Sequence, residues 1–301
     1  MFKKIVVPVD GSDLSGQIVP YAAALASASG VELELLHVID PDTVRVTREE
    51  EGVGITLASR EDSRKGWALS YLRQAAEQLK SAGVTAVTRI EVGAPEEVIV
   101  AAAGTEGDVL VAMATHGRTG LPRMMLGSVA DKVLHAGHMP LLLFRPRDQA
   151  EAGAKPPKTI IVPLNFQGAD AAMPMARFLA RSLGAKIILE RTVSPVPYLL
   201  PEAVAVGSGS YPEELLEPAE REARAQLQQQ VDSLQHEGLS AEAIVMTGGS
   251  GEETIRLAST TPDALVVMAT HARSGVSRTV MGSIAERIVR DLGSPVLVVR
   301  P

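Results

Sequence analysis

The sequence contains no cysteine, few aromatic residues and no long apolar run. The absence of cysteine excludes disulfides, thiolate metal sites, iron–sulfur clusters and cysteine nucleophiles. The longest apolar runs, such as Ile5–Val9 and Pro140–Phe144, are far shorter than the roughly 20 residues of a membrane-spanning helix. The basic start at Met1 has too short an apolar segment for a signal peptide, so we expect a first strand there. A cytoplasmic location without membrane contact is the default expectation.

Positive charge is also scarce. The chain has 29 Lys and Arg against 36 Asp and Glu, a net charge of −7, and aromatic residues make up 3%. Both values disfavour nucleic acid as a partner, since neither a basic surface nor many stacking platforms are available. Hydrophobic residues make up 46% of the 301 positions, which predicts a packed chain of about two domains.

An internal repeat divides the chain. Four blocks recur at a spacing of 155 residues: Lys4–Pro8 and Thr159–Pro163, Met113–Gly117 and Met268–Ala272, Leu126–Ser128 and Met281–Ser283, and Pro140–Pro146 and Pro295–Pro301. Between the copies, an Ala-, Pro- and charge-rich stretch without apolar periodicity is typical of a linker. We therefore predict two copies of one domain, at 1–146 and 158–301, joined by a linker at 147–157.

Strands and helices alternate in each copy. The first copy has short β-branched runs at Lys4–Val9, Glu32–Val38, Thr85–Val92, Val109–Met113 and Pro140–Phe144. Three predicted helical stripes consist of Leu14, Ile18, Tyr21, Ala22 and Leu25, then Leu69, Leu72, Ala76 and Leu79, then Ala223, Leu227, Val231 and Leu234. This alternation predicts an α/β fold of two tandem five-stranded parallel sheets, each the size of a flavodoxin. The segments Pro41–Gly66 and Ser194–Pro212 are predicted loops.

The first candidate site segment ends the first strand at Asp10-Gly11-Ser12. Ligands of such sheets bind outside the carboxyl ends of the strands, where the strand order reverses, and a carboxylate there can hold a ligand. The alternative is that Asp10 and Gly11 only make the turn, with Ser12 or Asp13 capping the next helix.

The second candidate segment runs from Met113 through a glycine-containing loop to a predicted helix start at Gly127-Ser128. A glycine there lets a phosphate approach the free N–H groups of the first helical turn, with His116 and Arg118 able to contact its oxygens. The alternative is a capping box, in which Ser128 caps a helix with Asp131 three residues on, as Ser283 and Glu286 would in the second copy.

Other motifs are missing. The chain has no G-x-x-x-x-G-K-[ST], H-E-x-x-H or G-x-S-x-G, the signatures of P-loop NTPases, zincins and common hydrolases. His135 and His138 are spaced like metal ligands, but no third ligand is evident, so we expect no metal there.

Together these residues resemble the universal stress protein family, whose nucleotide-binding members carry G-x2-G-x9-G-[ST]. The first strand with Asp10, then Ala114, Gly117, Gly127 and Ser128, corresponds to that pattern, with alanine at the first glycine. The resemblance extends over both copies and implies a five-stranded parallel sheet of order 3-2-1-4-5. It also implies ATP, with or without magnesium, as the ligand of the first copy.

The resemblance implies a specific set of contacts. Adenine and ribose would lie beside Pro8, Val9, Asp10 and the backbone of Val38. The triphosphate would lie against Met113, Ala114, His116, Gly117, Gly127, Ser128, Val129 and Ala130. The second copy has Asn165 for Asp10, Phe166-Gln167 for the following Gly-Ser, and Ala269 and Ala272 for the motif glycines. Because only Gly282 and Ser283 are kept, a weak or empty second site is expected, with no certain cofactor.

Three functions compete on this evidence. The first is a non-enzymatic ATP-binding module of the stress response, and the second a slow ATP hydrolase or phosphotransferase. The second is disfavoured because no magnesium-binding pair of carboxylates and no general base is evident beside the phosphate loop. The third is an interaction protein that binds no nucleotide. We also expect the apolar last strands, 140–144 and 295–299, to pair within the chain, and a homodimer of tandems is a further option.

Overall fold

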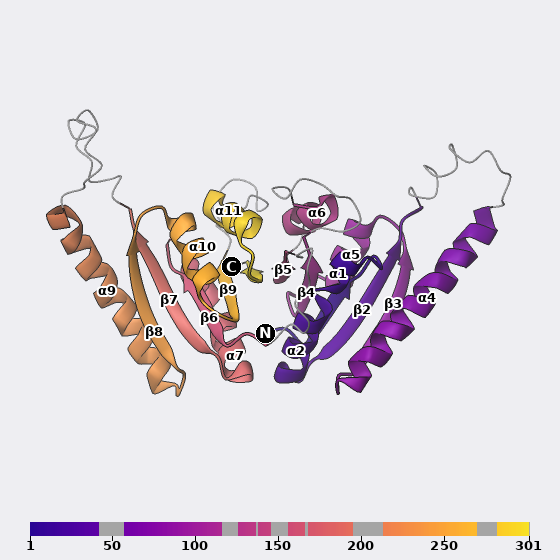
Figure 1. Cartoon of the computed structure of the whole chain (residues 1–301), viewed down its shortest axis with the longest axis horizontal. Coiled ribbons are helices and arrows are strands. Elements are labelled where there is room, and N and C mark those ends of the chain that lie inside the picture. The colour runs from indigo at the N-terminus through magenta and orange to yellow at the C-terminus, as the bar shows by residue number, and fades with distance from the viewer. Residues whose placement is uncertain are drawn as a thin grey trace, which may run out of the picture. The chain divides into compact units, whose positions relative to one another are not determined.

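The computed structural model describes residues 1–41, 57–115, 126–136, 138–145, 156–165, 168–194, 213–269 and 282–300. The chain forms two compact units, Met1–Pro156 and Pro157–Pro301 (Figure 1). Most of the predicted linker, 147–157, lies outside the described residues, so the domain bounds 1–146 and 158–301 stay predictions. The pairing of the last strands and a homodimer also stay predictions.

Unit 1 alternates strands and helices. Its elements are β1 (Lys4–Pro8), α1 (Asp13–Gly16), α2 (Val19–Ser29), β2 (Glu32–Ile39), α4 (Leu57–Ser81), β3 (Ala86–Val92), α5 (Pro95–Ala103), β4 (Val109–Ala114), α6 (Ser128–Ala136) and β5 (Leu141–Phe144). The five predicted strands are all present, within one residue at each end. Their order in the sheet is β3-β2-β1-β4-β5, and the neighbouring strands are parallel, which confirms the predicted topology.

Unit 2 repeats this plan. Its elements are β6 (Thr159–Pro163), the 3-10 helix η1 (Ala169–Ala172), α7 (Met173–Leu183), β7 (Lys186–Val193), α9 (Glu213–His236), β8 (Ala241–Thr247), α10 (Ser250–Thr260), β9 (Ala264–Ala269), α11 (Ser283–Asp291) and β10 (Val296–Val299). Within this unit the strand order is β8-β7-β6-β9-β10, again with parallel neighbours. The two units therefore share one topology.

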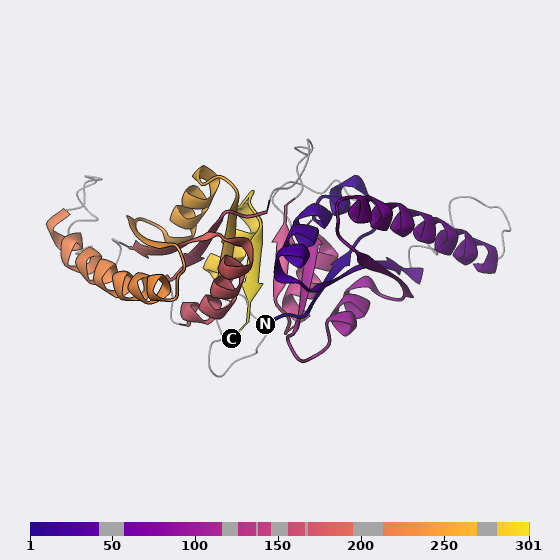
Figure 2. The ribbon, with the colours of Figure 1, turned by 90° about the horizontal axis from the view of Figure 1, so that it is seen from below.

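Helices cover both faces of each sheet, which explains the continuous apolar strands. In unit 1, α2 and α4 lie on one face and α5 and α6 on the other (Figure 2). Ile5, Val6 and Val7 of β1 are consequently all fully buried. The helices change face where the chain passes from β3 to β4, so the strand order reverses between β1 and β4. A crevice between loops is expected at this point.

The predicted loop over Pro41–Gly66 was wrong in its last part, because α4 begins at Leu57. Residues 57–66 include five charged side chains and a single leucine, so they carry no apolar stripe that would indicate a helix. The rest of that segment, like 195–212 of the second predicted loop, lies outside the described residues.

The buried face of α4 also differs from the predicted stripe. Leu69 is 44% exposed, whereas Ala68, Leu72 and Leu79 are buried. The small Ala68 therefore faces the core, where Leu69 was expected. Which of these neighbouring residues is buried depends on how α4 packs against the sheet. The stripe of α9, which comprises Ala223, Leu227, Val231 and Leu234, is buried as predicted.

Candidate functional site

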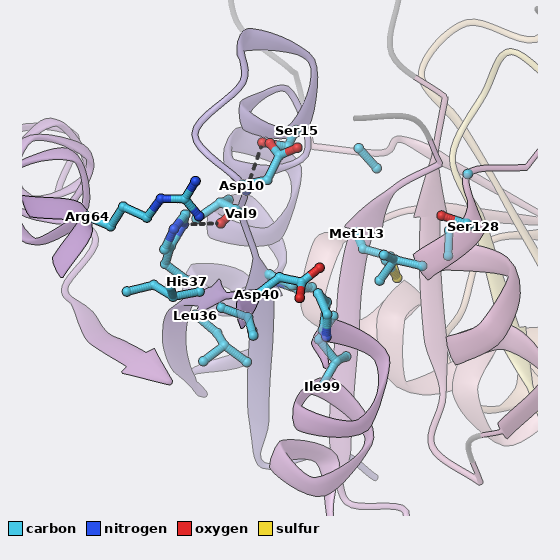
Figure 3. Close-up of a pocket in the computed structure, with 18 of the residues that line it drawn as sticks. Val9, Asp10, Ser15, Leu36, His37, Asp40, Arg64, Ile99, Met113 and Ser128 are labelled. Carbon is cyan, nitrogen blue, oxygen red and sulfur yellow. Dashed lines mark hydrogen bonds between the residues drawn. The ribbon is translucent and has the colours of Figure 1, made fainter. Parts of the chain in front are cut away.

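A pocket of about 670 Å³ lies in unit 1 at the carboxyl ends of β1, β2 and β4 (Figure 3). Its volume is that of an ordinary small-molecule site. The wall is completed by α4, α5 and the first turn of α6. The lining residues are Pro8, Val9, Asp10, Ser15, Leu36, His37, Val38, Ile39, Asp40, Ser63, Arg64, Trp67, Pro95, Ile99, Met113, Ala114, Thr115, Gly127, Ser128, Val129 and Ala130.

The structure brings the predicted site residues of the first copy together in this pocket. Ten of them line it: Pro8, Val9, Asp10, Val38, Met113, Ala114, Gly127, Ser128, Val129 and Ala130. The other two, His116 and Gly117, lie outside the described residues, as does Arg118. Residues as far apart in the sequence as Pro8 and Ala130 thus line one pocket, because parallel strands end at one edge of the sheet.

The turn after β1 positions Asp10. Its Oδ1 accepts hydrogen bonds from the Ser12 backbone N–H at 2.9 Å and from the Ser12 hydroxyl at 2.6 Å. The Ser12 hydroxyl oxygen accepts from the Ser15 N–H at 3.1 Å and so caps α1. The turn-and-cap interpretation is therefore correct, and it is compatible with a site, because the same hydrogen bonds fix the Asp10 carboxylate at the pocket wall.

Sequence reasoning missed the contribution of α4, above all Trp67, the single tryptophan of the chain. Its indole lies on Gly11, where an added Cβ would come within 2.1 Å of the ring; the positive φ of 79° also favours glycine there. The ring stacks on Tyr71 at 5.6 Å and meets His37 edge-on. Trp67 is 45% exposed, so a ligand in the pocket can still change its surroundings.

A hydrogen bond of the His37 side chain connects the carboxyl ends of β1 and β2. The Nδ1 of His37 lies 2.8 Å from the Val9 carbonyl oxygen, and the ring is buried. Because a carbonyl oxygen only accepts, Nδ1 carries the proton in this contact. The strand end that holds Asp10 is thereby fixed to β2 on one side and to Trp67 on the other.

The first turn of α6 presents backbone N–H groups that have no acceptor within the helix. The Gly127 N–H donates to the Thr115 carbonyl at 2.6 Å, and the first helical bond runs from the Asp131 N–H to the Gly127 carbonyl at 2.8 Å. Gly127 is therefore the N-cap residue, and the N–H groups of Ser128, Val129 and Ala130 have no acceptor within the helix. Together with the helix dipole they suit an anion such as phosphate.

The capping-box interpretation is wrong in its register. Each helix begins one residue earlier than a serine cap requires, at the serine itself. In unit 2 Gly282 is the N-cap of α11 and makes no side-chain cap bond, while Ser283 is the first helical residue. A glycine cap leaves room at the helix end that a capping side chain would fill.

The pocket carries charges of both signs. In the view of Figure 3, Arg64 and Ser128 lie on opposite sides, with Asp10, Asp40 and Met113 between them. Asp40 was not expected near the site, so the pocket wall contains a second carboxylate besides that of Asp10. Among the described residues, no group of three or more His, Asp or Glu side chains could hold a metal ion by itself.

Comparison with known proteins decides the family. The model described as Universal stress protein family matches residues 1–145 and again residues 157–300. The chain belongs to the universal stress protein family. Below, domain 1 and domain 2 denote these two matched ranges of the universal stress protein.

Individual proteins that are similar to this chain are also universal stress proteins. The chain is similar to universal stress protein MJ0531 of Methanocaldococcus jannaschii, with 33% identity over 146 residues, 48% of this chain and 83% of that one. A universal stress protein of Mycolicibacterium smegmatis is 24% identical over 306 residues, 99% of this chain and 97% of that one. The crystal structure of a universal stress protein from Archaeoglobus fulgidus has a TM-score of 0.70 at 19% identity, covering 99% and 98% of the two chains.

One more structural finding concerns the helices of this universal stress protein. In the part of the chain that the structure describes, no helix combines the length and the apolar character needed to cross a membrane.

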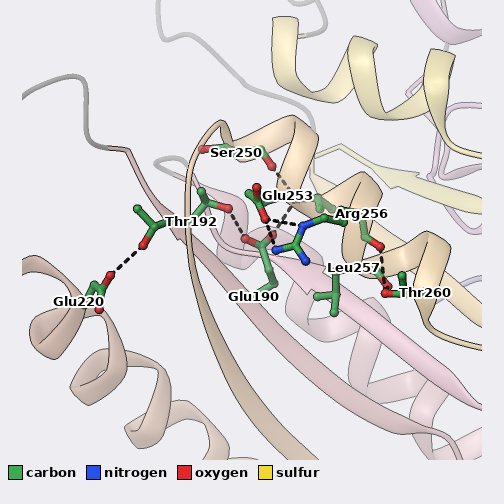
Figure 4. A network of polar contacts seen from close by, with 10 residues as sticks. Glu190, Thr192, Glu220, Ser250, Glu253, Arg256, Leu257 and Thr260 are labelled. Atoms are coloured by element: carbon green, nitrogen blue, oxygen red, sulfur yellow. Dashed lines mark hydrogen bonds and ion pairs between the residues drawn. The ribbon is translucent and has the colours of Figure 1, made fainter. Parts of the chain in front are cut away.

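Domain 2 of the universal stress protein has a polar network at the corresponding edge of its sheet (Figure 4). The buried Glu190 accepts from the Thr192 hydroxyl at 2.5 Å, the Thr254 hydroxyl at 2.7 Å and the Asn165 amide at 2.9 Å. Asn165 in turn accepts from the Thr192 N–H at 2.6 Å. All three donors to the carboxyl group are uncharged. Gly282 and Ser283, the retained motif residues, lie at the start of α11.

Burial raises the pKa of Glu190, against the lowering effect of its three hydrogen bonds; the charge of Glu253 adds to the rise. Arg256 pairs with Glu253 rather than with Glu190. The Thr254 hydroxyl also lies 2.9 Å from the Ser250 carbonyl oxygen. A protonated Glu190 can donate to Thr254 while Thr254 donates to Ser250, so every contact then joins a donor to an acceptor.

A pH dependence follows from this raised pKa. Folded Glu190 keeps its proton above the ordinary value of 4.5, so its contribution to stability is full below pH 4.5 and is lost as pH rises through the folded pKa. The free energy of unfolding of the wild type, minus that of Glu190→Gln, should therefore fall with pH above 4.5, by up to about 1.4 kcal/mol per pH unit. Urea unfolding at a series of pH values measures it, and a constant difference would contradict it.

Proposed function

We propose that domain 1 binds an adenine nucleotide, with ATP as the first candidate, and that the protein acts as a nucleotide-binding module of the stress response. The observation that carries this proposal is the pocket at the strand-order reversal, with the N–H groups of Ser128, Val129 and Ala130, which have no acceptor within α6, at one end. These donors suit the phosphates. The Asp10 carboxylate, held by Ser12 on the far side of Met113, suits the ribose hydroxyls.

The pocket also suits the metal ion that accompanies a triphosphate. Asp10 and Asp40 both line it, and carboxylate oxygens are the ligands that magnesium prefers. Because Asp10 is assigned to the ribose, Asp40 is the residue that we propose to hold magnesium together with the phosphate oxygens. The ion would supply charge neutralisation for the phosphates.

We propose binding rather than hydrolysis because two groups of the pocket that could act as a base, Asp10 and His37, are already engaged in hydrogen bonds. The Asp10 Oδ1 accepts two hydrogen bonds from Ser12, and the Nδ1 of His37 is engaged by the Val9 carbonyl. A general base must instead reach the proton that it removes. We therefore propose no catalytic residue.

The single tryptophan makes the test direct. The full chain, purified without added nucleotide, is titrated with ATP and magnesium while the fluorescence of Trp67 is recorded. We expect a saturable change that fits one ATP per chain, and native mass spectrometry should show the same stoichiometry. Adenosine and GTP, titrated in parallel, separate the contributions of the phosphates and of the base.

Two other outcomes would point to the competing functions. If neither fluorescence nor mass spectrometry detects ATP, an interaction protein without nucleotide replaces the proposal. If ATP is consumed over many turnovers with magnesium, and the turnover disappears in Gly127→Val, the protein is a hydrolase.

A further inference from the structure

The strand register of domain 2 reveals a correspondence that the repeat spacing hides. In domain 1, Pro8 pairs with Leu36, and the Val9 N–H donates to the Leu36 carbonyl at 2.9 Å. In domain 2, Pro163 pairs with Glu190, and the Leu164 N–H donates to the Glu190 carbonyl at 2.7 Å. Glu190 therefore takes the place of Leu36, at a spacing of 154 residues instead of the 155 that relates β1 to β6.

The partners of Glu190 correspond to pocket residues as well. By the same register Thr192 takes the place of Val38, and the residue after Leu164, Asn165, takes that of Asp10. The helices α5 and α10 start at matching positions after equivalent strand contacts, which places Thr254 where domain 1 has Ile99. The four domain 1 residues so replaced, Asp10, Leu36, Val38 and Ile99, all line the pocket.

The network thus joins the elements between which the domain 1 pocket opens. The Glu190 carboxyl group links the end of β6, through Asn165, to α10, through Thr254. Glu190 and Thr254 have no exposed surface. A ligand at this place would have to separate buried, mutually hydrogen-bonded groups, and each group left unpaired is costly.

We propose that Glu190 is the residue that excludes nucleotide from domain 2, because its hydrogen-bonded side chain closes the place that adenine and ribose take in domain 1. This inference rests on the proposed function of domain 1. The replacement of the motif glycines by Ala269 and Ala272 concerns the binding of the phosphates, so it is a separate reason for weak nucleotide binding in domain 2. Adenosine, which has no phosphate, therefore tests the closure by Glu190 alone.

The test converts the network into its domain 1 counterpart. A variant with Asn165→Asp, Glu190→Leu, Thr192→Val and Thr254→Ile is compared with the wild type by equilibrium dialysis against adenosine. We expect bound adenosine to rise from one to two per chain, with affinity at the new site at least about tenfold above that of wild-type domain 2. The matched control Glu190→Gln keeps the shape and the hydrogen bonds and should stay at one per chain.

Trp67 fluorescence and equilibrium dialysis together distinguish a failure of the proposed function from a failure of the inference about Glu190. Because Trp67 lies in domain 1, its fluorescence reports that domain, whereas dialysis counts both sites. If neither the Trp67 fluorescence nor native mass spectrometry of the wild type detects ATP, the proposed function fails. If Trp67 responds but a folded four-residue variant still binds one adenosine, the role of Glu190 is refuted.

A measurement on the wild type does not depend on the folding of that variant. Photo-crosslinking with 8-azidoadenosine, followed by peptide mapping, should label peptides of domain 1 at least tenfold more than those of domain 2. Comparable labelling of the domain 2 peptides around β6 and β7 would overturn the inference.

Discussion

Replacing Gly127 with valine is expected to weaken ATP binding by domain 1 at least 100-fold, which corresponds to about 2.7 kcal/mol. Gly127 caps α6, and its neighbours Ser128, Val129 and Ala130 offer the N–H groups that we assign to the phosphates. A branched side chain at the cap would occupy the path along which a phosphate approaches these donors. Titration of Trp67 fluorescence with ATP measures the loss.

The chain provides a matched control in Gly282→Val, at the corresponding cap of α11. Gly282 has φ −65° and ψ 148°, which valine adopts without strain. This variant should bind ATP as the wild type does, since we expect no nucleotide in domain 2. A loss of binding in Gly282→Val, or unchanged binding in Gly127→Val, would refute the assignment of the phosphate end.

Replacing Glu190 with alanine is expected to destabilise domain 2 by about 3 kcal/mol. The substitution leaves a cavity and removes the acceptor of three donors, which are the buried hydroxyls of Thr192 and Thr254 and the half-buried amide of Asn165. Urea unfolding followed by far-UV circular dichroism measures the loss. The fluorescence of Trp67 reports domain 1, so it shows whether the effect is confined to domain 2.

Glu190→Gln again serves as the control, now for the network as a whole. Its carbonyl oxygen can accept from Asn165 and Thr254 while its amide donates to Thr192, so all three contacts of residue 190 remain hydrogen bonds and only the contact of Thr254 with the Ser250 carbonyl loses its hydrogen. We expect a change below about 1 kcal/mol near neutral pH. Equal losses in the alanine and glutamine variants would show that the negative charge, rather than the hydrogen bonds, stabilises this region.

The fold and much of the pocket could be predicted because they depend on local patterns. Buried strands such as β1 have continuous apolar sequences, and the repeat shows each pattern twice. Once the strands are parallel, their carboxyl ends must meet, which brings Asp10, Met113 and Gly127 together without knowledge of any contact. The family resemblance then selected the individual residues.

The contributions of α4 and of Asp40 could not be predicted in the same way. The first turns of α4 are rich in charged residues and have no apolar stripe in their sequence, so the sequence does not indicate a helix there. That Trp67 lies on Gly11 depends on how the helix crosses the sheet. A lone tryptophan after a polar stretch was the only signal, and it does not by itself distinguish a pocket wall from a core position.

The sequence by itself determined that the chain is two copies of one α/β domain and that the motif residues of the copies differ. Repeats and apolar periodicity are properties of the residue order, so no contact has to be known to find them. Only the tertiary structure decided how the copies differ. One residue fewer between β6 and β7 places Glu190 at the position of Leu36, where a spacing of 155 would give Arg191. Hydrogen bonds between strands set that register, so a constant spacing of 155 residues could not reveal it.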